Sequence, residues 1–264
     1  MSQNDRATSG ESLLERVDWI LDAIQEAGYL TLTGVVERTG LARSTAHRLL
    51  LQMEHRNWLF RVGTNYELGP RLFDLGIGGV RDHWFYRRAR PAMESLYDLT
   101  GGLVHLAFLR DREVVFWDAL GSRTQPTSID SQIGAKVPVH ATALGKALMA
   151  SQPPGLVATF APFQGYTSAT IDSPTELQRS LEIIRRDGYA WDWGEYRNDI
   201  GCVATPLHAE IDNPSSTYRT TAALSICLPL SRLDSRLLTP LMQAKRRFTQ
   251  LAKVNPMIDP HTTN

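Results

Sequence analysis

The sequence has only two cysteines, Cys202 and Cys227, and its 28 basic residues balance 28 acidic ones over a length of 264. Two cysteines exclude the multi-bridge framework of a small secreted protein. Zero net charge argues against a protein that coats nucleic acid or a membrane surface nonspecifically. No apolar run approaches the roughly 18 residues of a membrane span. The polar start, MSQNDRATSGES, lacks the apolar stretch of a signal peptide. We therefore expect a cytoplasmic protein, with a disordered tail at residues 1–10 and no membrane partner.

Familiar catalytic and cofactor motifs are missing as well. There is no G-x-S-x-G nucleophile turn and no H-E-x-x-H zinc motif, and the Gly-Lys pair at 145–146 lacks the other residues of a phosphate-binding loop. Four histidines are scattered along the chain and are better explained as structural residues than as metal ligands: His83, His105, His140 and His208. We expect no catalytic residue, no metal and no cofactor, and hence no enzyme.

What the sequence does contain is a winged helix-turn-helix pattern at residues 32–68. A first helix is expected to start after Thr33 as N-cap, and Gly40 supplies the turn. In the second helix Ala46, Leu49, Leu50 and Met53 follow the spacing of one buried face. Residues 59–62 and 66–68 flank a turn-rich loop and predict a β-hairpin wing. An ordinary pair of surface helices is the simpler alternative, but the combination of all four parts favours DNA binding.

The polar side of the second helix is expected to face the major groove, where base edges present a readable code. The residues expected to contact bases or phosphates are Arg43, Ser44, Thr45, His47 and Arg48 of this helix, and Arg61 of the wing. Five arginines stand against three glutamates in residues 32–68, an excess of only two positive charges. Because this excess is mild, affinity should come from the two footprints of a dimer.

The rest of the chain predicts an α+β protein. An amphipathic helix from Leu13 to Ile24, ended by Gly28, completes a DNA-binding domain at residues 11–69. Residues 70–90 read as a helical linker, and Pro91 suits the first turn of the next helix. From 91 to 264, strands are expected at 102–110, 113–120, 189–193, 201–208 and 219–228, with helices at 143–151, 174–187 and 233–252. Two adjacent antiparallel strands early and two late, with helices between them, indicate an α+β domain.

Thr142 suggests a ligand site in that domain. As an N-cap it would leave the backbone N–H groups of Ala143, Leu144 and Gly145 pointing out of a helix start among apolar residues, a geometry that favours a carboxylate. The simpler interpretation is that Thr142 only caps a structural helix.

Several segments together resemble the IclR-type transcriptional regulators: GLARSTAHRLL at 40–50, VPVHATALGKALMA at 137–150, DGY at 187–189, CVATPL at 202–207 and AALSICLPLSR at 222–232. The resemblance implies a GAF-like effector domain and a first helix that contributes to dimer contacts. It also implies a pocket against the helix start at 143. Matched position by position, the implied pocket residues are Ile129, Val137, Ala143, Leu144, Asp192, Cys202, Ser225 and Cys227.

Two features depart from the family pattern. The family commonly has Ser-x-Ser-Gly-Pro in its last strand, whereas this chain reads Ser225-Ile226-Cys227-Leu228-Pro229. A thiol in place of a hydroxyl is compatible with a less polar effector, such as an aromatic acid. The polar hairpin at 208–220 is longer than the family pattern and leaves the strand register open.

The sequence therefore predicts a homo-oligomeric regulator, a dimer or a dimer of dimers, that binds a double-stranded DNA operator and a small-molecule effector, either as activator or as repressor. The alternative is a redox- or metal-responsive regulator that uses Cys202 and Cys227, which would need the two sulfurs close together.

Overall fold

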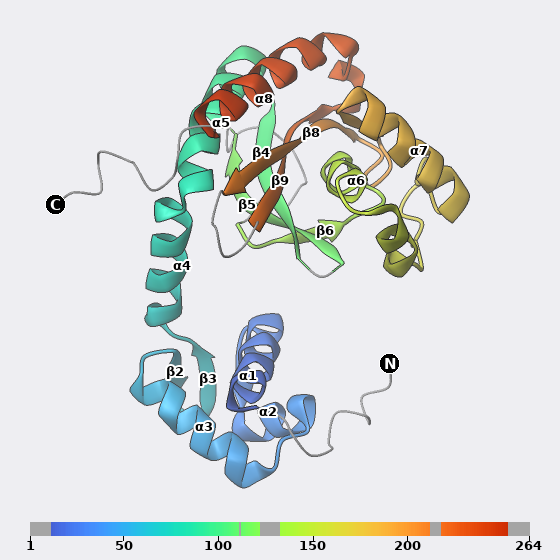
Figure 1. The fold of residues 1–264 in the computed structure, drawn as a ribbon. Coiled ribbons are helices and arrows are strands. Elements are labelled where there is room, and N and C mark those ends of the chain that lie inside the picture. The colour runs from blue at the N-terminus through green and yellow to red at the C-terminus, as the bar shows by residue number, and fades with distance from the viewer. Residues whose placement is uncertain (1–11, 111, 122–132, 212–217, 253–264) are drawn as a thin grey trace, which may run out of the picture. The chain divides into compact units, whose positions relative to one another are not determined.

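The computed structural model describes residues 12–110, 112–121, 133–211 and 218–252 (Figure 1). The chain divides into two compact units between Asp82 and His83. Each unit has a hydrophobic core of its own. Within the described residues, no helix is both long enough and apolar enough to cross a membrane.

The N-terminal unit is a three-helix domain with a small sheet, followed by a fourth helix. Its elements are α1 (Leu13–Ala27), β1 (Leu30–Thr31), α2 (Leu32–Thr39), α3 (Arg43–His55), β2 (Leu59–Val62), β3 (Asn65–Leu68) and α4 (Pro70–Asp82). The three strands pair antiparallel in the order β1-β3-β2. α1 ends at Gly28, as the sequence predicts.

The helix-turn-helix has the predicted parts, with one shift. α2 is capped by Thr31, whose hydroxyl accepts the N–H of Gly34, and not by Thr33. The earlier start was missed because Leu30 and Thr31 form a short strand that runs directly into the helix. Gly40 ends α2 with a left-handed φ of 72°, a conformation that glycine adopts without steric cost. The α3 residues Ala46, Leu49, Leu50 and Met53 are buried as expected.

The C-terminal unit begins with α5 (Trp84–Thr100), which starts earlier than predicted. Pro91 lies inside this helix and not in its first turn. The helix extends back to Trp84 because Phe85 and Ala89, one turn apart, are fully buried in the core and His83 provides the N-cap.

A six-stranded antiparallel sheet forms the centre of this unit, in the order β6-β5-β4-β9-β8-β7 (Figure 1). The strands are β4 (Leu103–Arg110), β5 (Glu113–Leu120), β6 (Lys136–Pro138), β7 (Ala190–Trp193), β8 (Ile200–Ile211) and β9 (Tyr218–Pro229). β6 was not predicted, because three residues are too few to show an alternating pattern. β8 extends beyond 208, and its register with β9 continues to the pair Ile211↔Tyr218.

Helices cover both faces of this sheet. α5 and α8 (Leu238–Ala252) pack on one face, and α6 (Ala143–Ala150) and α7 (Pro174–Asp187) pack on the other (Figure 1). α8 starts at 238 and not at 233, because two 3₁₀ turns, Leu230–Arg232 and Ser235–Leu237, precede it; a third 3₁₀ helix spans Pro154–Phe160.

The side chains of β9 alternate between the two cores. Leu224 and Ile226 face α5 and α8, whereas Ala223 and Cys227 face the α6 side. The α6 side is the face on which the candidate ligand site lies.

Candidate functional site

A pocket lies between the start of α6 and the sheet face that α6 covers. Its interior, counting the part open to solvent, measures about 430 Å³. Its lining consists of His105, Phe116, Val137, Thr142, Ala143, Leu144, Asp192, Tyr196, Arg197, Ile200, Cys202, Ser225 and Cys227.

Seven of the eight ligand residues expected from the sequence lie in this lining. They come from five elements that are far apart in the chain, namely β6, α6, β7, β8 and β9: Val137, Ala143, Leu144, Asp192, Cys202, Ser225 and Cys227. Ile129 falls outside the described residues.

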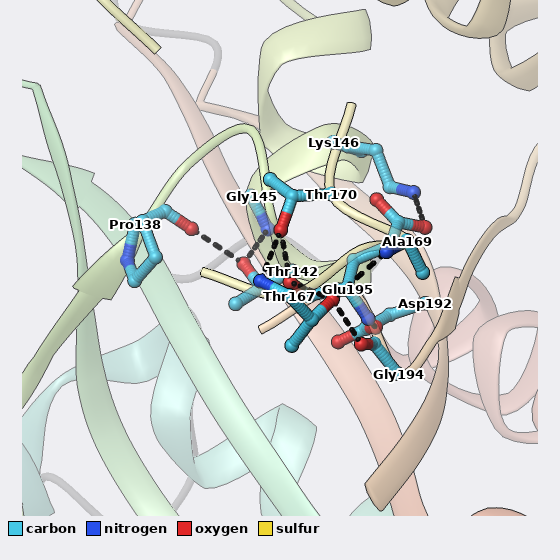
Figure 2. Close-up of polar contacts among 10 residues, drawn as sticks. All are labelled: Pro138, Thr142, Gly145, Lys146, Thr167, Ala169, Thr170, Asp192, Gly194 and Glu195. Atoms are coloured by element: carbon cyan, nitrogen blue, oxygen red, sulfur yellow. Dashed lines mark hydrogen bonds and ion pairs between the residues drawn. The ribbon is translucent and has the colours of Figure 1, made fainter. Parts of the chain in front are cut away.

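The start of α6 is held tightly against the segment that precedes it. Thr142 caps the helix: its hydroxyl donates to the carbonyl of Pro138 at 2.8 Å and accepts the N–H of Gly145 at 3.1 Å (Figure 2). This cap uses the Gly145 N–H that was expected to point outward, so the N–H groups of Ala143 and Leu144 are the ones left for an anion. A Cβ on Gly145 would lie 2.1 Å from the carbonyl oxygen of Val139, so only glycine fits there.

Two buried carboxyl groups lie beside the pocket. Asp192, 3 % exposed, accepts the N–H of Glu195 at 2.7 Å, and the carboxylate of Glu195 is ion-paired with Lys146 on α6 (Figure 2). Burial raises the pKa of Asp192 to about 7, and the nearby Glu195 adds to this rise, whereas hydrogen bonds and Lys146 oppose it. Burial likewise raises the pKa of Glu195, against the effect of Lys146.

The loop that carries Glu195 is fixed by two threonines. The hydroxyl of Thr167 donates to the carbonyl of Gly194 at 2.7 Å, and that of Thr170 donates to the carbonyl of Glu195 at 2.6 Å (Figure 2). These bonds pre-organise the loop between β7 and β8, which supplies Tyr196 and Arg197 to the pocket.

Several lining residues were missed by sequence reasoning. Arg197 is the only arginine among the described lining residues. Its Nε is buried and makes no hydrogen bond to any described residue, but it forms an ion pair with the carboxylate of Asp199 at 3.6 Å. His105 stacks on Phe116 with ring centres 4.4 Å apart. Alternation along β4 and β5 could have indicated that these two rings share a face, but nothing in the sequence indicates that the face lines a pocket.

The two cysteines are brought together. Cys202 on β8 lies directly opposite Cys227 on β9, their Cα atoms are 4.2 Å apart, and the sulfurs form a disulfide. The Nδ1 of His105 lies 3.7 Å from the sulfur of Cys227. In the described part of the chain, no group of three or more His, Cys, Asp or Glu residues could hold a metal ion.

The residues expected to contact DNA form a polar surface on the N-terminal unit. Arg43, Ser44, His47 and Arg48 are exposed on α3, and Thr45 is half-buried. Arg43 donates to the hydroxyl of Thr33 at 3.3 Å, which orients its guanidinium. On the wing, Arg61 donates to the carbonyl of Gly63 and lies over the ring of Tyr66.

Both units match family models. Residues 14–63 match the IclR helix-turn-helix domain, and residues 80–250 match the C-terminal domain of the bacterial transcriptional regulator IclR. The chain belongs to the IclR family. It is a DNA-binding transcriptional regulator with a C-terminal effector-binding domain.

Individual proteins agree with this assignment. The acetate operon repressor of Salmonella typhimurium is 31% identical over 241 residues, which cover 89% of this chain and 83% of the repressor. The regulator XynR of Escherichia coli is 33% identical, over 84% of this chain and 87% of its own. A crystal structure of an IclR homolog from Microbacterium hydrocarbonoxydans, complexed with 4-hydroxybenzoate, matches with a TM-score of 0.77 and 25% identity, over 92% of this chain and all of that one.

Proposed function

We propose that the effector of this IclR-family regulator is a small aromatic carboxylic acid that binds in the pocket at the start of α6. The observation that carries this proposal is the composition of the pocket, where helix N–H groups and an arginine share a mostly apolar lining with a buried acid.

The carboxylate of such an acid would find two kinds of donor. The N–H groups of Ala143 and Leu144 lie at the positive end of α6, and the guanidinium of Arg197, whose Nε is ion-paired with Asp199 at 3.6 Å, can donate to a carboxylate. The flat faces of His105 and Phe116 offer an apolar wall for a ring. Asp192 can accept a hydrogen bond from a ring hydroxyl. The Microbacterium homolog complexed with 4-hydroxybenzoate, a hydroxylated aromatic acid, supports the same class.

Calorimetry on the full chain with 4-hydroxybenzoate, benzoate and short aliphatic acids tests this proposal. Ala143→Trp would fill the pocket and should abolish binding, while operator affinity stays near wild type. Arg197→Ala should weaken binding about tenfold or more, because it removes a charged hydrogen-bond partner. Arg232→Ala removes an exposed arginine outside the pocket and should leave acid binding unchanged. A neutral compound that binds where no carboxylic acid does would refute the proposal.

We propose further that the regulator acts in the cytoplasm as a homodimer or a dimer of dimers, without enzymatic activity. α3 would lie in the major groove with Arg43, Ser44, Thr45, His47 and Arg48 toward the bases, and Arg61 near phosphates. A dimer supplies two such helices, so the operator should contain two half-sites related by a twofold axis. Footprinting and sedimentation of the complex test both statements.

The disulfide between Cys202 and Cys227 favours a second candidate function, a redox-responsive regulator. Disulfides are rare in the reducing cytoplasm and, when present, often serve redox sensing. Titration of free thiols under oxidant, with operator binding followed in parallel, tests this candidate.

A further inference from the structure

The cysteine pair is pre-organised by the sheet. The register of β8 and β9 continues on both sides of the pair, through Gly201↔Leu228 and Val203↔Ile226. Both strands are interior strands, with β9 between β4 and β8 and β8 between β9 and β7. The backbone therefore holds the two side chains within bonding reach, and the bond can open and close without a rearrangement of the sheet.

Both sulfurs belong to the wall of the effector pocket. Cys202 is 8 % exposed and Cys227 is 3 % exposed, and both lie in the pocket lining together with Ser225. Backbone hydrogen bonds already join β8 to β9 along their length. A disulfide whose role was only to hold these two strands together would therefore add little. Because the two cysteines line the pocket, their redox state determines whether a bound ligand contacts two thiols or one disulfide.

The surroundings of Cys227 suit thiol chemistry. Complete burial lowers the pKa of His105 to about 4, so its ring is neutral at pH 7. In the tautomer with a bare Nδ1, that nitrogen lies 3.7 Å from the sulfur and can accept a hydrogen bond from the reduced Cys227 thiol. The hydroxyl of Ser225 lies 3.9 Å from the same sulfur. The reduced thiol therefore has polar neighbours, and the fraction of it that ionises is the reactive form.

We propose that Cys202 and Cys227 form a redox-active pair whose oxidation state sets the affinity of the pocket for its acid effector. This inference rests on the proposed function for its ligand, but not for its redox chemistry.

Hydrogen peroxide can oxidise the cysteine pair, and glutathione can reduce it. For oxidation, the Cys227 thiolate attacks hydrogen peroxide and breaks its O–O bond, which yields a sulfenic acid and, with one proton, water. The Cys202 thiol then attacks that sulfur, the S–S bond forms, and a second water leaves. For reduction, the thiolate of glutathione attacks one sulfur, and a second glutathione releases the mixed disulfide as oxidised glutathione.

The reduced form should bind the effector more tightly. Two thiols bring two S–H donors to the wall beside Ser225, whereas disulfide sulfurs carry no proton to donate. Loss of one hydrogen bond corresponds to about a tenfold weaker affinity. Coupling between two sites is reciprocal, so a bound effector should disfavour disulfide formation by the same factor.

The experiment uses the full chain in glutathione buffers of graded redox ratio. Free thiols are counted with a chromogenic reagent after acid quenching, and the affinity for 4-hydroxybenzoate is measured by calorimetry at the reduced and oxidised ends. We expect two thiols to be lost together, reversibly, and the affinity to fall about tenfold on oxidation. Saturating 4-hydroxybenzoate should shift the thiol titration toward more oxidising buffers.

Two variants serve as controls. Cys227→Ser and Cys202→Ser each leave one thiol and cannot form the bond, so neither should show any dependence of affinity on the buffer. Thiols that do not oxidise as a pair, or an affinity equal in both states, would overturn this inference while acid binding stands. Reversible loss of two thiols in a chain that binds no carboxylic acid would instead retain the redox pair and refute the proposed effector.

Discussion

Asp192 is a pocket residue whose charge changes near neutral pH. It lines the pocket, is almost completely buried, and contacts the backbone of the loop that carries Glu195. With a pKa raised to about 7 by burial, its carboxyl is mostly neutral at pH 6 and mostly ionised at pH 8. A neutral carboxyl can donate to or accept from a ligand, whereas an ionised one repels a carboxylate.

The affinity for an acid should therefore fall as pH rises through about 7. If only the protonated form of Asp192 accepts the anion, the affinity drops about tenfold between pH 6 and pH 8, since a benzoate stays ionised throughout. Asp192→Asn, which is neutral at every pH, should flatten this dependence. Calorimetry at pH 6, 7 and 8 measures both proteins. The same slope in the Asn variant would assign the titration to another group, such as Glu195, whose pKa is also raised by burial.

We expect the polar residues of α3 to contact bases and Arg61 of the wing to contact phosphates. Arg48→Ala should cost about 1–3 kcal/mol per half-site and relax the base preference at one position, because a bidentate base contact is lost. Arg61→Ala should weaken all sequences alike and reduce the salt dependence, as loss of a phosphate contact does. Binding measured on operator variants at two salt concentrations separates these effects. An Arg48 variant that folds and binds with unchanged affinity would exclude α3 as the recognition helix.

At the scale of elements, the position of α6 depends on close backbone packing against the segment that precedes it. Gly145 lies against the backbone of Val139, and Thr142 caps the helix. Gly145→Ala must push α6 away from the preceding segment, and we expect a loss of stability of about 3 kcal/mol or more, at the upper end of overpacking costs. Thr142→Ala removes one cap and should cost about 1 kcal/mol.

Urea unfolding of both variants gives these values, and acid binding should suffer more in Gly145→Ala than in Thr142→Ala. The reason is that a shifted helix moves the N–H groups of Ala143 and Leu144, whereas a lost cap leaves them in place. A Gly145→Ala variant as stable as the wild-type protein would mean that the segment around Val139 moves aside at no cost.

At the scale of the whole molecule, the two units have separate cores, and each should fold alone. A fragment of residues 83–264 keeps α5 whole, with Phe85 and Ala89 in the core. A fragment that begins at 91, the boundary suggested by Pro91, lacks both residues. We expect it to be less stable by about 3–5 kcal/mol, the usual cost of removing a buried phenylalanine.

Thermal and urea unfolding compare the two fragments, and calorimetry with 4-hydroxybenzoate shows whether the longer one binds as the full chain does. If the two fragments are equally stable, Phe85 contributes little to this core and the unit begins later than α5.

The sequence by itself determined the elements whose cause is local. Ala46, Leu49, Leu50 and Met53 show one buried face of α3, Gly40 ends α2, and Thr142 caps α6. Periodicity and capping act within a few residues, so they can be read from the order of residues. The pocket residues Val137, Asp192 and Ser225 came from the family resemblance and not from any local pattern.

The tertiary structure decided what depends on residues distant in the chain. It placed Arg197 and His105 in the pocket, raised the pKa of Asp192 by burial, and joined Cys202 to Cys227. It also extended α5 back to Trp84, because Phe85 fills a core made by other elements. Burial and strand register arise only when separate segments pack together, and the spacing of residues along one segment does not contain that information.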